Sequence, residues 1–168
     1  MIKETELKIS GVGFPSWSAR GCQQTLTPIR PDVLHRTVNG DLHYVGKPSY
    51  HKYTSVVTCE DKVAPAMNAA WRGSKLTISC LPFLWQQASG RSAELSRLPV
   101  AESIVVIDGA GQIVQDCEIR GTTVTLPRQI ADGYVKYRPI LQMLLTDFQV
   151  HQDEWGKKLG WKLSLEEV

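Results

Sequence analysis

Asn39 and Gly40 lie between two β-prone runs, and this dipeptide constrains the fold more than any other feature of the sequence. Both residues tolerate the positive φ of a type I′ turn, so Asn-Gly in such a setting is the strongest short hairpin signal. We therefore expect a hairpin over residues 34–45. Residues 52–59 are aromatic and β-branched without a helical period, which predicts a third strand paired with that hairpin as the nucleus of the sheet.

The bulk composition describes an ordinary soluble domain. A chain of 168 residues can bury one sizeable core, and a charged fraction of 21% is typical of globular proteins. The formal net charge of +2 is far from the concentrated positive field of a nucleic-acid-binding protein, so no nucleic acid is expected as a partner. The apolar runs are too short to span a bilayer, and the N-terminus lacks a signal-like segment. We expect no membrane contact and synthesis in the cytosol.

Alternating apolar and polar residues predict further strands along most of the chain. Residues 75–80 alternate as a half-buried strand does, and residues 104–119 form a second hairpin around an Asp-Gly turn. Residues 134–150 are apolar on both faces near their centre, which suits a buried strand, and they pair with residues 161–166 in a long terminal hairpin.

Two stretches depart from this strand pattern. Residues 65–71 have a helix-like composition, with Pro65 suited to the first helical position and Gly73 to the end. Residues 86–103 are polar and contain the breakers Gly90 and Pro99, which predicts a protruding surface loop. The expected fold is mainly β: a single-domain β-sandwich or β-barrel over residues 1–168, with one short helix, a protruding loop or hairpin and a loop-rich excursion at about residues 86–123.

The residue types that carry metal or redox chemistry are scattered. The four cysteines contain no C-x-x-C pair, so zinc gains little support, and Cys59 and Cys80 suit buried positions at the ends of strands. His35, His43 and His51 recur every eight residues, and the hairpin would place the first two opposite one another. A two-histidine site is geometrically possible, but surface histidines explain the spacing more simply.

No catalytic or phosphate-binding motif occurs in the sequence: G-x-S-x-G, H-E-x-x-H, the P-loop and G-x-G-x-x-G are all missing. The paired acids at 153–154 and 166–167 are explained by a turn and by a solvated terminus. We therefore expect no enzyme, no cofactor and no metal.

Five tryptophans suit either a carbohydrate-stacking platform or a protein interface, because indole offers a large apolar face and one donor. Core packing is favoured for Trp71 and Trp161. Trp85, beside Phe83 and Leu84, is the best candidate for an exposed contact.

The sequence resembles a family of small tailed-bacteriophage virion proteins over nearly its whole length. The resemblance rests on Ser18-Ala19-Arg20-Gly21, Gln24-Thr25-Leu26, Arg36-Thr37-Val38-Asn39-Gly40, Lys52-Tyr53, Thr58-Cys59, Pro65-Ala66, Trp71-Arg72-Gly73, Tyr137-Arg138-Pro139, Asp153-Glu154-Trp155-Gly156 and Leu163-Ser164-Leu165-Glu166-Glu167-Val168. Residues 86–123 are the variable part.

The resemblance implies a structural, non-catalytic part of the tail tip or baseplate, such as a distal tail or hub-associated subunit, assembled in the host cytoplasm. Its expected partners are further copies of itself in a homo-oligomeric ring and other phage tail proteins. Contacts are expected at Phe14, Trp17, Phe83, Leu84 and Trp85. Head-decoration, collar and tail-completion proteins are also small and β-rich. A module of the adsorption apparatus that binds a host glycan or receptor is the other alternative.

Overall fold

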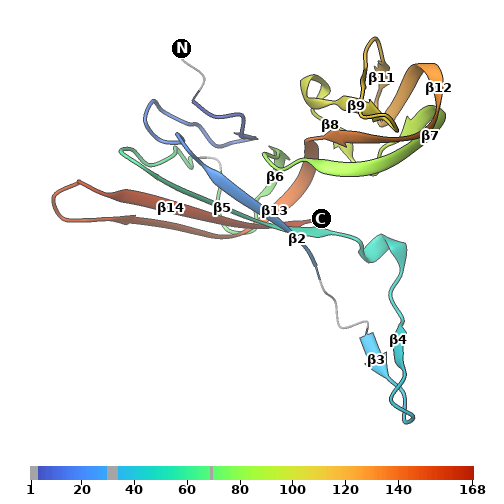
Figure 1. The fold of residues 1–168 in the computed structure, drawn as a ribbon. Helices are drawn as coiled ribbons and strands as arrows, with labels where there is room; N and C mark the ends of the chain where they lie inside the picture. Colours follow the sequence, from blue (N-terminus) through green and yellow to red (C-terminus); the bar gives the residue numbers. More distant parts are fainter. Residues whose placement is uncertain (1–3, 30–33, 69) are drawn as a thin grey trace.

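The computed structural model describes residues 4–29, 34–68 and 70–168, and nearly all of its regular elements are β-strands (Figure 1). The predicted mainly β fold is confirmed. Within the described residues the helical elements are two single 3-10 turns, η1 (Pro48–Tyr50) and η2 (Ala101–Ser103).

The short helix predicted at residues 65–71 is wrong. Ala66 instead forms an isolated antiparallel bridge with Gly13, in which each backbone N–H donates to the other residue's carbonyl at 3.0 and 2.8 Å. Tertiary pairing thus takes the backbone groups that a helix would use, and only a turn from Met67 to Ala70 follows.

The larger sheet is antiparallel and is built around the C-terminal hairpin. Its strand order is β1 (Lys8–Ile9), β6 (Lys75–Ser79), β13 (Pro139–Gln152), β14 (Leu159–Glu167), β5 (Tyr53–Asp61) and β2 (Gln23–Pro28), and the short β8 (Leu98–Pro99) also pairs with β13. The predicted terminal hairpin and the strand at residues 75–80 are both confirmed. One register shift, between Leu145 and Asp147, interrupts the pairing of β13 with β14.

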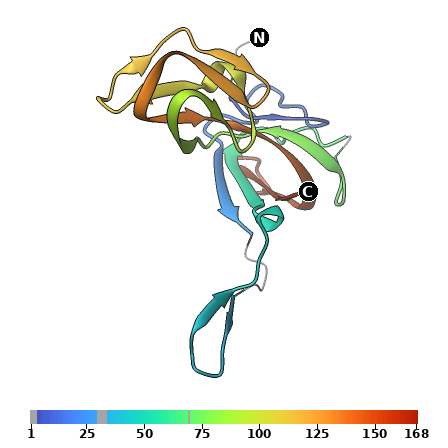
Figure 2. The same cartoon turned by 90° about the vertical axis from the view of Figure 1, so that its right-hand side faces the viewer.

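A smaller, curled sheet comprises β7 (Leu84–Glu94), β9 (Val105–Asp108), β10 (Ile113–Val114), β11 (Glu118–Arg120) and β12 (Thr123–Tyr137). The long β12 pairs with β7 along one edge and with β11 and then β9 along the other. Figures 1 and 2 show this sheet at the top of the molecule, above the larger one. The hairpin predicted over residues 104–119 is confirmed in its first part as β9 and β10, but its second strand is shorter than predicted, because residues 118–120 form β11 and pair with β12.

The surface loop predicted at residues 86–103 is wrong, because residues 86–94 belong to strand β7 and the rest of the segment contains β8 and the 3-10 turn η2. Strand β7 escapes a hydrophobicity count because its buried positions hold small alanines, Ala88 and Ala93, and because most of its residues after Trp85 are polar. Pairing with β12 makes this segment a strand, although its own sequence does not predict one.

Each sheet has its own apolar core. In the larger sheet alternate residues of β13 and β14 point into one cluster, with Leu141, Met143, Trp161 and Leu163 almost completely buried. The smaller sheet buries a separate cluster in which Leu126 and Tyr137 are the largest fully buried side chains. The core position predicted for Trp161 is thus confirmed, whereas the one predicted for Trp71 is wrong, since that side chain is 80% exposed.

Arg138 lies at the junction where β12 of the smaller sheet runs into β13 of the larger one. Arg138 is buried, and its backbone N–H donates to Ser103 Oγ at 2.9 Å. Its guanidinium pairs with the Glu6 carboxylate at 3.0 Å, and its carbonyl accepts from the Val100 N–H at 2.8 Å. The junction is therefore tied to the N-terminal segment and to the chain between β8 and β9.

The predicted hairpin at residues 34–45 is confirmed as β3 (Leu34–Arg36) and β4 (Leu42–Tyr44). The type I′ turn expected at Asn39-Gly40 is wrong, because only Gly40 of the two has a positive φ and the turn spans Thr37 to Gly40. The hairpin projects from the molecule as an arm, clear of both sheets, in Figures 1 and 2. The predicted third strand is present as β5, but the prediction that it pairs with the hairpin is wrong. Both edges of β5 are occupied, by β14 and β2, so the hairpin is an appendage of the sheet and not its nucleus.

Candidate functional site

The arm, residues 34–45, is formed by local interactions alone. Gly40 adopts φ 87° at its tip, a conformation that glycine takes without steric cost, and the Gly40 N–H donates to the Thr37 carbonyl at 2.9 Å. The Thr37 N–H in turn donates to the Asp41 carbonyl at 2.9 Å, and Arg36 Nη1 donates to the carbonyl of Gly40 at 2.9 Å. These contacts explain how the sequence forms a defined hairpin without help from either core.

Every residue of the arm is exposed, although many of them are apolar. Val38 at the tip is fully exposed, and Leu34, Leu42, Tyr44 and Val45 are each more than half exposed. A two-stranded hairpin without a hydrophobic partner is at best marginally stable in water. An apolar arm of this kind is typical of a segment that is covered by another chain.

An apolar pocket of about 500 Å³ lies at the root of the arm. Its walls come from the end of β2 (Pro28), from the arm (Leu34, Tyr44) and from the return of the chain through η1 (Tyr50). The Tyr44 hydroxyl lies 3.4 Å from a ring nitrogen of His51, which joins the arm to this return segment. The pocket has the size and lining that accept apolar side chains.

Arg97, which lines this arm-root pocket, forms a largely buried ion pair with Glu167. Arg97 Nε donates to Glu167 at 2.7 Å, and Arg97 Nη2 donates to the His51 carbonyl at 2.5 Å. The same carboxylate accepts from the Tyr53 N–H at 2.9 Å, and the Arg97 guanidinium lies 5.6 Å from the centre of the Tyr53 ring. The root is thus fixed to β5 and β14 even though the arm itself is not.

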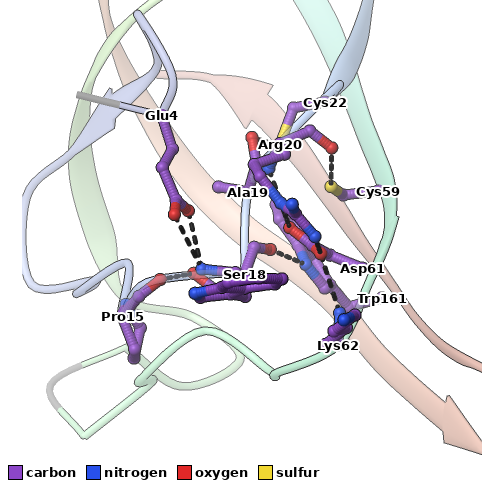
Figure 3. A network of polar contacts seen from close by, with 11 residues as sticks. Glu4, Pro15, Ser18, Ala19, Arg20, Cys22, Cys59, Asp61, Lys62 and Trp161 are labelled. Atoms are coloured by element: carbon purple, nitrogen blue, oxygen red, sulfur yellow. Dashed lines mark hydrogen bonds and ion pairs between the residues drawn. The ribbon is translucent and has the colours of Figure 1, made fainter. Parts of the chain in front are cut away.

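A second cluster fixes the N-terminal segment to the end of β5 (Figure 3). Three nitrogens of Arg20, the backbone N, Nε and Nη2, donate to the Asp61 carboxylate at 3.0, 3.2 and 2.6 Å. Asp61 also accepts from the Lys62 N–H at 2.9 Å, and its side chain is only 2% exposed. The Arg20 guanidinium and these backbone donors hold the pKa of Asp61 below its usual range, and Asp61 raises the pKa of Arg20.

Trp17 is constrained within this cluster. It has φ 71°, a strained value for a bulky residue, and its backbone N–H donates to both carboxylate oxygens of Glu4 at 2.9 and 2.8 Å. Its carbonyl accepts from two successive N–H groups after β5, and Arg20 and Lys62 each place their cationic group 4.3 Å from its ring centre. These contacts hold the indole in place, and 46% of the residue remains exposed.

Phe14 belongs to the core and is only partly exposed. Its ring stacks on Trp161 with centroids 6.0 Å apart, and Trp161 Nε1 donates to the Ser18 carbonyl at 2.8 Å. The N-terminal passage is therefore anchored by one apolar and one polar contact to β14. Sequence reasoning identified both aromatic residues of this passage, but not Glu4, Arg20 and Lys62, which hold Trp17 in place.

The other three predicted contact residues lie at the start of β7. Phe83 and Trp85 are 45% and 58% exposed, whereas Leu84 points the other way and packs against the core of the smaller sheet. The alternation of a strand explains this division. Lys136, opposite Trp85 on β12, lies 5.0 Å from the Phe83 ring centre and 5.7 Å from that of Trp85.

The histidines and cysteines have the simple environments that the sequence favoured. His35 and His43 are directly opposite on the arm and both exposed. Among the described residues no group of three or more His, Cys, Asp or Glu side chains could hold a metal. The cysteines are free, with Cys59 and Cys80 buried as predicted. Burial raises the pKa of the Cys80 thiol to about 12.

No protein-family model, curated protein or solved structure matches this chain. In the part of the chain that the structure describes, no helix is long and apolar enough to span a membrane. The functional proposals below therefore rest on the sequence and on the geometry of the arm, its root and the exposed aromatic side chains.

Proposed function

We propose that this protein is a structural subunit of a tailed-phage virion, at the tail tip or baseplate, which self-associates into a ring and docks to other tail proteins. The observation that supports this proposal best is the arm, whose apolar side chains are all exposed in the single chain. The placement in a phage tail rests on the sequence resemblance. The role is architectural and not catalytic.

The proposed contact joins the arm of one copy to the arm-root pocket of the next. The arm offers Val38 and Leu42, which are apolar and exposed, and the pocket offers about 500 Å³ of largely apolar space. The contact is heterologous, because arm and pocket are different surfaces. A repeated heterologous contact forms a ring when the rotation from one copy to the next closes on itself, and this closed form is the one we propose.

The test is the mass of the purified protein in solution, measured by light scattering behind a sizing column over a range of concentrations. The wild-type protein is expected to form a closed oligomer as its concentration rises. The double variant Val38→Asp/Leu42→Asp is expected to remain monomeric yet fold normally, because neither side chain is buried in its own chain.

A matched control is Val63→Asp, which places the same charge at an exposed apolar residue outside the arm. This variant is expected to assemble as the wild type does. A wild-type protein that stays monomeric at every concentration, or an arm variant that assembles normally, would contradict self-association through the arm.

A further inference from the structure

The smaller sheet carries a hollow of about 370 Å³ between β7 and β12, on a different part of the molecule from the arm. The side chains of Gln87, Ser89, Asp132 and Tyr134 line it. The remaining lining residues are small: Ala88 of β7, Gly133 of β12 and Gly109 in the turn after β9. We call this site the β7–β12 hollow.

An aromatic row continues from the β7–β12 hollow along the same face of the sheet. Gln87 is directly opposite Tyr134, and Trp85 is directly opposite Lys136. Because alternate residues of a strand share a face, Trp85 and Tyr134 are diagonal neighbours on one face, a spacing that large side chains can bridge. Trp85 is 58% exposed and Tyr134 is 47% exposed, so neither side chain is buried in the core.

The chemistry of these side chains selects the class of ligand. Exposed indole and phenol rings offer flat apolar faces that stack on the C–H face of a sugar ring. The amide of Gln87 both donates and accepts hydrogen bonds, the hydroxyl of Ser89 does the same, and the carboxylate of Asp132 accepts. Such a mixture of aromatic surface and a few polar groups suits a polyhydroxylated molecule.

The charge of the β7–β12 hollow argues against an anionic ligand. Asp132 contributes a carboxylate, and none of the described lining residues is a lysine or arginine. The nearest cation along the aromatic row, Lys136, lies over the rings of Phe83 and Trp85. A phosphate or sulfated group would meet the repulsion of Asp132 inside the hollow.

We propose that the β7–β12 hollow and Trp85 together form a binding site for a neutral saccharide, with Trp85 and Tyr134 stacking on sugar rings and Gln87, Ser89 and Asp132 binding hydroxyl groups. This site goes beyond the architectural role. It uses none of the residues of the arm or of the arm-root pocket.

The test is a titration of the full-length protein with neutral oligosaccharides of glucose, galactose, mannose and N-acetylglucosamine, followed by tryptophan fluorescence and by calorimetry. At least one of these probes is expected to bind saturably with Kd of about 1 mM or tighter. Trp85→Ala is expected to weaken that binding at least about tenfold, which corresponds to the loss of one stacking contact.

Two further variants make the outcome specific. Asp132→Asn is expected to weaken binding less than Trp85→Ala does, because an amide still accepts one hydrogen bond. Trp155→Ala removes another exposed indole, 81% exposed in the turn after β13, and is expected to leave binding unchanged. Circular dichroism of each variant checks that it is folded.

Three results would overturn the saccharide site: no saturable binding of any neutral probe up to about 10 mM, equal binding by Trp85→Ala, or preferential binding of sulfated over neutral oligosaccharides. The arm variant Val38→Asp/Leu42→Asp is expected to bind saccharide as the wild type does. A failure of the saccharide site can therefore be told apart from a failure of arm-mediated assembly.

Discussion

Substitution of Trp161 by phenylalanine is expected to destabilise this protein more than an ordinary change from one aromatic residue to another. Trp161 is 1% exposed in the core of the larger sheet, and its Nε1–H donates to the Ser18 carbonyl at 2.8 Å. Ser18 itself is fully buried. Phenylalanine has no N–H, so the variant leaves this carbonyl without its donor.

Two contributions give the expected size of the effect. A buried acceptor left without its hydrogen bond costs about 1–3 kcal/mol. The smaller ring also removes three heavy atoms from a fully packed site, which costs roughly 2 kcal/mol in lost burial and residual cavity. The free energy of unfolding should therefore fall by about 3–5 kcal/mol, a large share of the ~5–15 kcal/mol that stabilises a typical domain.

The assay is equilibrium unfolding in guanidinium chloride followed by far-UV circular dichroism, because removing an indole changes the fluorescence signal itself. Trp155→Phe is the matched control: that residue is 81% exposed, and its change should stay within about 0.5 kcal/mol. If the free energy of unfolding of Trp161→Phe lies within about 1 kcal/mol of the wild-type value, the anchoring of the N-terminal passage through Ser18 is refuted.

Three further predictions concern other contacts. Arg20 and nearby backbone N–H groups lower the pKa of Asp61, so this carboxylate stabilises the fold above its usual pKa and the stability is lost as pH falls through the acid range. Asp61→Asn should therefore lower Tm at pH 7, and the Tm of this variant should fall less steeply toward pH 3 than that of the wild type. Parallel plots of Tm against pH for the two proteins would disprove this. Gly133→Ala should lower the free energy of unfolding by about 1–3 kcal/mol, because the added Cβ would lie 2.6 Å from a carbonyl oxygen of β9. Gly13→Ala is the control in the same denaturation assay and should be tolerated, because its nearest contact would lie at 3.5 Å. Cys80 should resist iodoacetamide at pH 8 until the protein unfolds, because its thiol is buried and has a pKa raised to about 12. Labelling of Cys80 in the native protein, detected by mass spectrometry, would contradict this.

Features encoded over short stretches of the chain were predicted well from the sequence. The hairpin signal at Asn39-Gly40 and the alternation of residues 75–80 are both local, and the structure contains the corresponding hairpin and strand, although the turn spans Thr37 to Gly40 and is not type I′. The long terminal hairpin is also evident in advance, because β13 and β14 carry enough apolar residues to require burial.

Features that depend on distant partners were predicted poorly. The helix expected at residues 65–71 fails because Ala66 pairs with Gly13, more than fifty residues away in the sequence. Core packing was favoured for Trp71, yet this side chain is 80% exposed and its backbone N–H donates to Ser74 Oγ. Residues 86–103 were expected to form a loop because they are polar and contain Gly90 and Pro99, whereas pairing with β12 makes residues 86–94 part of strand β7.

The candidate surfaces divide in the same way. The sequence alone indicated that Trp85 and Phe83 are contact candidates and that the chain forms a mainly β fold with a hairpin at Asn39-Gly40. Only the tertiary structure decided that this hairpin stands clear of both sheets, that Arg20 and Lys62 flank Trp17, and that Tyr134 continues the row of Trp85. The physical reason is that turn geometry and alternation are local properties, whereas the free edges of a sheet and the exposed neighbours of a side chain are set by pairings between distant segments.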